Sequence, residues 1–215
     1  MSYKYVIFDF DGTVANSSEG VSASICYALE SFGIPIPPED VMIKFFGPPL
    51  VNGFMDNVGV DEETAVALTE KYRELYTDNA MYLLELYDGV RELLEKLKAN
   101  GIKIGIASSK PKKFFDKLLE KLEITDYFSA ICGADTDDKD NGKKEIIENS
   151  IKHLGAQNLD DVIMVGDRMF DIEGAHQAGL KCIAVTYGFG TREEFEEYDA
   201  EYIVDTPEEI LSIVK

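Results

Sequence analysis

The chain has 215 residues, of which 45% are hydrophobic and 29% are charged, and its formal net charge at pH 7 is −20. This apolar content is enough to bury the core of one large domain, or of a domain with a smaller insertion, and it argues against a wholly disordered chain. The negative charge argues against nucleic acid or an anionic membrane surface as a partner, because Lys and Arg supply most of the affinity for both.

The sequence also bears on the compartment. No stretch approaches the roughly 18 apolar residues of a membrane-spanning helix, and aspartates interrupt the short apolar run near the N-terminus, which does not suit a secretion signal. The three cysteines, Cys26, Cys132 and Cys182, are isolated along the chain. A disulfide framework or a zinc site is therefore a poor interpretation. We expect free thiols in a cytoplasmic protein.

Short apolar runs that predict buried strands recur along the chain. Runs that are apolar at nearly every position are typical of a parallel sheet covered on both faces. From residue 102 onward, helical patterns separate them, so we expect an α/β fold with a doubly wound, mostly parallel, Rossmann-like sheet. The runs lie at Tyr3–Phe8, Ile102–Ala107, Phe128–Cys132, Val162–Val165, Cys182–Val185 and Tyr202–Val204.

Helix boundaries are marked by residues with defined capping roles. Pro111 is expected to open the helix that follows the second strand, because proline suits the first helical position. An apolar stripe predicts a helix over Gly142–Leu154. The segments Thr191–Glu194 and Thr206–Glu209 have the Thr-x-x-Glu spacing of capping boxes.

The stretch between residues 16 and 86 has a different character, because it contains no strand pattern. Val21–Phe32 and Thr64–Tyr76 have helical patterns. A helical block of this length is too long for an ordinary crossover between strands. We therefore expect an α/β core made of residues 1–15 and 87–215, and an inserted all-helical subdomain made of residues 16–86.

Two aspartates follow the first predicted strand. Asp9 and Asp11 are separated by one residue, and the spacing directs both side chains to one side of an extended chain. Gly12 permits a tight turn after them. The carboxyl ends of strands are where α/β sheets bind their ligands, which favours a functional role for this pair over a solvated loop.

A second acidic group follows the strand Val162–Val165. Asp167 is expected at the strand end, and Asp171 at the start of the next helix, where a plain N-cap is the alternative. Carboxylates that converge from two strand ends repel one another unless a cation neutralises them. Oxygen ligands without Cys or His favour a hard cation, and Mg²⁺ fits best. The metal-site candidates are Asp9, Asp11, Asp167 and Asp171.

Two further segments are candidates for binding an anion. Ser108 and Ser109 follow the strand Ile102–Ala107, where a hydroxyl and the N–H groups of a helix start would bind phosphate, although a simple N-cap is equally compatible. Lys143 opens a helix, against the preference of the helix dipole, and is in register with buried positions. Lys144 is expected to be more exposed.

Together these motifs resemble the haloacid dehalogenase superfamily over nearly the whole chain. DFDGT at 9–13 is similar to its first motif, Ser108 to its second, a lysine near 143 to its third and GDRMFD at 166–171 to its fourth. The insertion resembles a C1-type helical cap. GPPL at 47–50 and YGFGT at 187–191 are similar to the phosphoglycolate-phosphatase-like branch.

The resemblance implies a Mg²⁺-dependent phosphatase that acts on a small phosphorylated metabolite. In such enzymes Asp9 would be the nucleophile that forms an aspartyl-phosphate, and Asp11 would protonate the leaving group and then activate water. The metal would contact Asp9, the backbone carbonyl of Asp11, Asp167 and, directly or through other groups, Asp171. Ser108 and Lys143 would hold the phosphoryl oxygens. The third motif often reads Lys-Pro, whereas Lys144 follows here, which leaves the choice of lysine open.

Several alternatives stay open. The same motifs occur in sugar phosphomutases of the β-phosphoglucomutase type, and a catalytically silent phosphate-binding module can share the fold. Phosphoglycolate, a nucleotide, a sugar phosphate and pyrophosphate are all candidate substrates. Lys44 and Gly47 of the insertion are candidate substrate contacts. The sequence does not determine the oligomeric state, and a monomer is slightly favoured.

Overall fold

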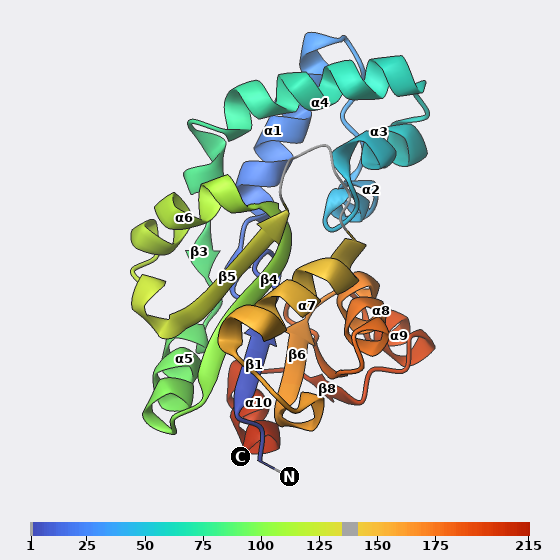
Figure 1. The fold of residues 1–215 in the computed structure, drawn as a ribbon. Helices are drawn as coiled ribbons and strands as arrows, with labels where there is room; N and C mark the ends of the chain where they lie inside the picture. The colour runs from blue at the N-terminus through green and yellow to red at the C-terminus, as the bar shows by residue number, and fades with distance from the viewer. Residues whose placement is uncertain (1, 135–141) are drawn as a thin grey trace. The chain divides into compact units, whose positions relative to one another are not determined.

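The computed structural model of the protein describes residues 2–134 and 142–215 (Figure 1). The chain divides into two compact units. The core unit consists of Met1–Asn16 and Leu86–Lys215, and the insert unit consists of Ser17–Glu85. Each unit is described below by itself.

The core unit is built on a parallel sheet. Within the described residues it has six strands in the order β5-β4-β1-β6-β7-β8, and every described pairing between neighbours is parallel. This order confirms the predicted α/β fold with a doubly wound sheet. The strands are β1 (Tyr5–Phe8), β4 (Lys103–Pro111), β5 (Phe128–Ala134), β6 (Val162–Gly166), β7 (Lys181–Val185) and β8 (Tyr202–Val204).

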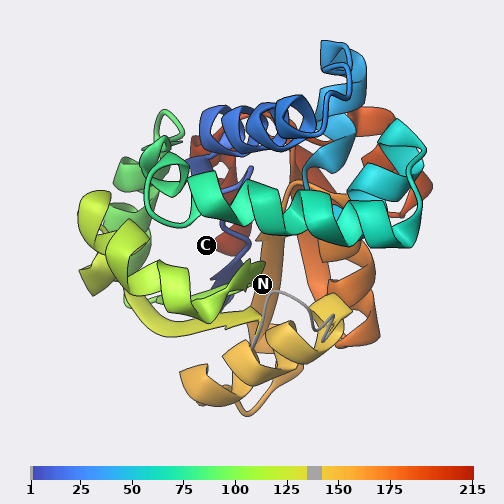
Figure 2. The ribbon, with the colours of Figure 1, turned by 90° about the horizontal axis from the view of Figure 1, so that it is seen from above.

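Helices cover both faces of this sheet. Figures 1 and 2 show α7 in front of the strands and α10 behind them. One face is closed by an apolar cluster in which Ile7 and Met164 of the strands join Ile147 of α7 and Ile172 of α8. Successive strand residues point to opposite faces. Since Ile163 is also fully buried, the other face is covered as well. The helices of this unit are α5 (Val90–Ala99), α6 (Phe115–Lys121), α7 (Gly142–Leu154), α8 (Met169–Gln177), α9 (Arg192–Glu197) and α10 (Pro207–Val214).

The structure at the end of β4 differs from one expectation. Pro111 was expected to open a helix, but it is the last residue of β4, and a 3₁₀ turn, Lys112–Phe114, precedes α6. The cause is local: Pro111 has φ −56° and ψ 132°, an extended conformation that continues the strand. Proline fixes only φ, so it is compatible with either structure.

The insert unit is helical. Helices α1 and α4 lie side by side (Figure 2), and Ile25 and Leu29 of α1 and Leu68 and Tyr72 of α4 are buried. Two-residue strands, β2 (Ala15–Asn16) and β3 (Glu85–Leu86), pair where the chain passes between the units. The helices are α1 (Ser18–Ser31), α2 (Glu39–Met42), α3 (Leu50–Val58) and α4 (Glu62–Tyr76), with 3₁₀ turns at Ile43–Phe45 and Ala80–Tyr82. None of the helices in the described parts of the chain has the length and apolar character needed to cross a bilayer.

The strand order decides where a ligand can bind. β1 lies between β4 and β6, and the chain extends the sheet first on the β4 side and then on the β6 side. In open α/β sheets such a reversal leaves a crevice at the carboxyl ends of the strands, where ligands bind. The residues that follow β1, β4 and β6 therefore gather at one edge of the sheet.

The buried face of α5 gives a test of the packing. We expect Leu94→Ala to lower the free energy of unfolding by about 2–5 kcal/mol, because Leu94 is fully buried and its truncation leaves a cavity. Leu159→Ala, at a position with 43% exposure, is the matched control and should change it by less than about 0.5 kcal/mol. Urea denaturation followed by circular dichroism measures both. Equal losses in the two variants would contradict the described packing of α5.

Candidate active site

Asp9 and Asp167 come from the ends of neighbouring strands. Asp9 directly follows β1 and Asp167 directly follows β6. The backbone N–H of Asp9 donates to the carbonyl of Val165 at 2.9 Å, which extends the pairing of the two strands by one residue. Both aspartates are buried, with 8% and 0% exposure. The sheet register therefore places two carboxylates together inside the protein.

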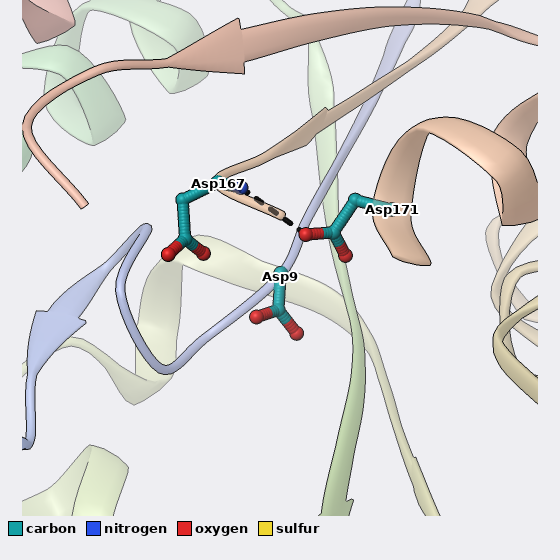
Figure 3. Close-up of side chains that lie close together, drawn as sticks. All are labelled: Asp9, Asp167 and Asp171. Carbon is teal, nitrogen blue, oxygen red and sulfur yellow. Dashed lines mark hydrogen bonds between the residues drawn. The ribbon is translucent and has the colours of Figure 1, made fainter. Parts of the chain in front are cut away.

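Asp171 adds a third carboxylate from the first turn of α8. Its Oδ2 accepts hydrogen bonds from the backbone N–H groups of Asp167, at 3.1 Å, and Arg168, at 3.0 Å. Figure 3 shows the three side chains converging, and oxygen atoms from all three lie within 4.8 Å of one another. Asp171 is the third residue of α8, and Arg168 occupies the N-cap position. Asp171 is thus not a plain N-cap.

The turn after β1 is shaped to fit Asp167. Gly12 has φ +86°, and a Cβ at this position would lie 2.1 Å from Oδ2 of Asp167. Thr13 Oγ1 donates to Oδ1 of Asp167 at 3.0 Å, and the backbone N–H of Phe189 donates to Oδ2 at 2.9 Å. These two donors fix the orientation of the buried carboxylate.

Lys143 reaches the same cluster from α7. Its Nζ lies 2.7 Å from Oδ1 of Asp9 and 2.6 Å from Oδ1 of Asp171, and its side chain has 8% exposure. A Cβ at Gly174 of α8 would lie 2.7 Å from Cγ of Lys143, so glycine is what lets the lysine pass. Lys144 instead forms a surface pair, with its Nζ 3.7 Å from Glu148. The structure therefore places Lys143 inside the site and Lys144 outside it.

Charge and burial oppose each other in this cluster. Burial raises the pKa of Asp9 to about 6, helped by the charges of Asp171 and Asp11 and opposed by Lys143. Burial also raises the pKa of Asp167 well above its ordinary value, and Asp171 and Asp9 add to the effect. For Lys143 burial lowers the pKa, but the charges of Asp171 and Asp9 outweigh it, so its pKa is raised. The residues of the site that the structure describes therefore carry more negative than positive charge.

The donor set fits a divalent cation. Among the described residues, the ammonium of Lys143 is the one that pairs with these carboxylates, so two negative charges stay uncompensated there when all three are ionised. Buried like charges at such distances repel strongly unless a counter-charge is present. The cluster offers only carboxylate oxygens, the ligands that hard cations prefer. Asp9, Asp167 and Asp171 could therefore hold a divalent metal ion.

Asp11 is placed differently from the other candidate ligands. Its side chain is not one of the three that converge, and its Oδ2 lies 3.1 Å from Nζ of Lys110. Its Oδ1 is buried and has no hydrogen-bond partner among the residues that the structure describes. Asp11 thus has one oxygen held by a cation and one oxygen without a donor. Lys110 directly follows Ser109 in the sequence, but no pattern in the sequence predicted its contact with Asp11.

The serine segment differs in part from what was expected. Ser108 is buried, and its Oγ accepts a hydrogen bond from the backbone N–H of Lys110 at 3.3 Å. Ser109 is exposed. Both residues lie in β4, so the expectation of N–H groups from a helix start at this position was wrong. Of the two serines, only Ser108 is buried.

Some contacts of the site were not identified from the sequence. Thr13 and the backbone of Phe189 hold Asp167. Thr13 lies in the DFDGT motif and Phe189 in the YGFGT segment, but the sequence alone assigned neither residue a role. The candidate substrate residues Lys44 and Gly47 lie in the insert unit, where both are exposed.

Comparison with known proteins extends this description. A family model described as haloacid dehalogenase-like hydrolase matches residues 6–185. The chain is 34% identical over 198 residues to a 5'-nucleotidase of Pseudomonas aeruginosa, covering 92% of this chain and 89% of the relative. It is 28% identical to phosphoglycolate phosphatase 1 of the same species, over 97% of this chain and 78% of the relative. A crystal structure of a predicted phosphatase from Clostridium acetobutylicum superposes with a TM-score of 0.92 and 38% identity, covering 100% of this chain and 99% of that one.

The family match spans the three converging aspartates, Ser108 and Lys143. The residues that the fold brings together are thus inside the segment that the family shares. On this evidence the chain belongs to the haloacid dehalogenase-like hydrolases.

Proposed function

We propose that the protein hydrolyses a small phosphate monoester in a Mg²⁺-dependent reaction at the Asp9 site. The observation that carries this proposal is the convergence of Asp9, Asp167 and Asp171 with Lys143 at the switch point of the sheet. The 5'-nucleotidase and phosphoglycolate phosphatase among its relatives support the same class of reaction.

Magnesium is the cation that this site suits best. Mg²⁺ binds through a small number of carboxylates together with waters and substrate phosphate, and the cluster offers oxygen ligands alone. When bound, the ion would neutralise the carboxylates and polarise the phosphoryl group. Asp9 and Asp167 would be direct ligands, and Asp171, which is already held by two backbone N–H groups, would be a ligand or would orient the others.

In the first step, an oxygen of Asp9 attacks phosphorus, and the bond from phosphorus to the ester oxygen breaks. A carboxylate and a phosphate repel each other, so the positive charge of Lys143 beside Asp9 lowers this barrier. Asp11 donates a proton to the departing oxygen, which leaves as an alcohol. Ser108, buried in the second half of β4, would donate a hydrogen bond to a phosphoryl oxygen.

In the second step, water releases the phosphate from Asp9. Asp11, now ionised, accepts a proton from the attacking water, and phosphorus separates from the Asp9 oxygen as inorganic phosphate. The pair formed with Lys110 holds one oxygen of Asp11 in place through both steps. Asp11 is thereby restored to its protonated state for the next turnover.

The insert unit is proposed as the cap that selects the substrate. Lys44 and Gly47 are its candidate contacts, and both are exposed. Closure of such a unit over a bound substrate excludes water and completes the set of catalytic groups. Ranking phosphoglycolate, nucleoside monophosphates and sugar phosphates by kcat/KM identifies the substrate.

The nucleophile is tested by Asp9→Asn. We expect kcat to fall by about three orders of magnitude or more, because the amide is a poor nucleophile for phosphorus. Phosphate release from a generic monoester in the presence of MgCl₂ measures it. Asp126→Asn, at an exposed position, is the control and should retain full activity. Unchanged turnover in Asp9→Asn would refute the proposal, and binding of a phosphate analogue by an inactive wild-type protein would identify a silent module.

The role of Asp11 is tested by changing the leaving group. We expect Asp11→Asn to lower kcat about 10²–10⁴-fold for an alkyl phosphate, whose alkoxide needs a proton, because this is the usual contribution of general acid catalysis. The loss should be much smaller for transfer from p-nitrophenyl phosphate, whose leaving group is stable as an anion. Burst-phase kinetics isolates this first step. Equal losses for both substrates would contradict proton donation by Asp11.

The raised pKa of Asp9 gives a pH dependence. Between its ordinary value of 3.8 and about 6, the folded metal-free chain holds a proton that the unfolded chain has lost, so this carboxyl lowers folding stability as pH rises through that window. Mg²⁺ must displace the proton. We therefore expect MgCl₂ to raise Tm clearly near pH 7.5 and much less near pH 5, as measured by differential scanning fluorimetry. Equal rises at the two pH values would contradict this assignment.

A further inference from the structure

We propose that Glu194 is a positioning residue of the metal site, which it serves by fixing the turn between Asp167 and Asp171 from a neighbouring helix. Glu194 belongs to α9 and lies beyond the segment, residues 6–185, that the family model matches. The inference rests on the metal-dependent reaction proposed above.

Glu194 forms hydrogen bonds with residues of that turn. Its Oε1 accepts a hydrogen bond from the backbone N–H of Met169, at 2.7 Å, and another from Nε of Arg168, at 3.0 Å. The side chains of Glu194 and Arg168 have 20% and 15% exposure. One carboxylate oxygen therefore holds both residues that immediately follow Asp167.

The start of α8 depends on a partner from outside the helix. A helix leaves its first N–H groups without intrahelical acceptors, and a Ser, Thr, Asp or Asn at the N-cap usually supplies one. The N-cap of α8 is Arg168, whose guanidinium only donates. Glu194 supplies the acceptor for Met169, the first residue of α8. The carboxylate of Asp171 is thereby oriented by a first turn that Glu194 holds.

Glu194 bonds to α8, whereas the equivalent glutamate of a second capping-box segment bonds within its own helix. Thr191–Glu194 and Thr206–Glu209 share the spacing of a capping box. The second box is complete: Glu209 accepts from the backbone N–H of Thr206 at 2.9 Å. In the first, Thr191 Oγ1 accepts from the backbone N–H of Glu194 at 3.2 Å, but the Glu194 carboxylate turns to Met169 instead.

Packing of α9 against the apolar core fixes the position of Glu194. Phe195, next to Glu194, is fully buried and belongs to the apolar cluster that also contains Ile172 of α8. Residues that orient metal ligands through hydrogen bonds commonly change metal affinity about 10–100-fold when they are replaced. We therefore expect Glu194 to strengthen the binding of the cation and to take no direct part in the chemical step.

The test is magnesium binding to Glu194→Gln, with Glu196→Gln, an exposed glutamate of the same helix, as the matched control. Isothermal titration of MgCl₂ into substrate-free protein should show a Kd about 10-fold higher in Glu194→Gln and unchanged in Glu196→Gln. The Glu194→Gln variant should stay folded without metal, with a small loss of Tm because the pair with Arg168 is weakened, and saturating MgCl₂ should restore its kcat.

The outcomes separate the two proposals. A wild-type protein that binds no Mg²⁺ would refute the metal-dependent function itself. A wild-type protein that binds Mg²⁺ with the same Kd as Glu194→Gln would overturn only the role of Glu194, as would a kcat that stays low at saturating MgCl₂. If Glu194→Gln does not fold, Glu194→Asp, which keeps the charge but shortens the reach, decides the question by the same titration.

Discussion

Repulsion among three buried carboxylates is the constraint on which this structure depends. Asp9, Asp167 and Asp171 share one small volume, and in the described part of the chain one ammonium, that of Lys143, pairs with them. Burial of ionised groups is costly unless they are paired and hydrogen-bonded. The chain concentrates that cost at the place where a bound cation would relieve it and would also attract an anionic phosphate. The pKa of Asp9 is raised mainly because burial disfavours the ionised carboxylate.

The fold supports this arrangement through rigid elements. The parallel register of β1 and β6 sets the separation of Asp9 and Asp167, and apolar residues on both faces keep the strands in place. Around the cluster, Thr13 and the backbone of Phe189 bind Asp167, and backbone N–H groups bind Asp171. Such preorganised donors let the site keep its geometry while charge moves in the reaction.

Much of the fold was predictable because strand and helix periods are local signals. The parallel sheet was expected from continuous apolar runs, and the inward position of Lys143 followed from its register with Ile146 and Ile147. The extension of β4 through Pro111 could not be predicted, because proline tolerates both outcomes. The sequence could not predict the contacts of Lys110 with Asp11 and of Glu194 with Met169 either, because they depend on how separate elements pack.

The most direct measurement is a crystal structure of the protein with MgCl₂ and beryllium fluoride, a mimic of the phosphoryl group. The account predicts Mg²⁺ bound to carboxylate oxygens of Asp9 and Asp167, with the fluoride mimic attached to the free oxygen of Asp9 and contacted by Lys143. A cation bound elsewhere, or a mimic attached to no aspartate, would contradict it.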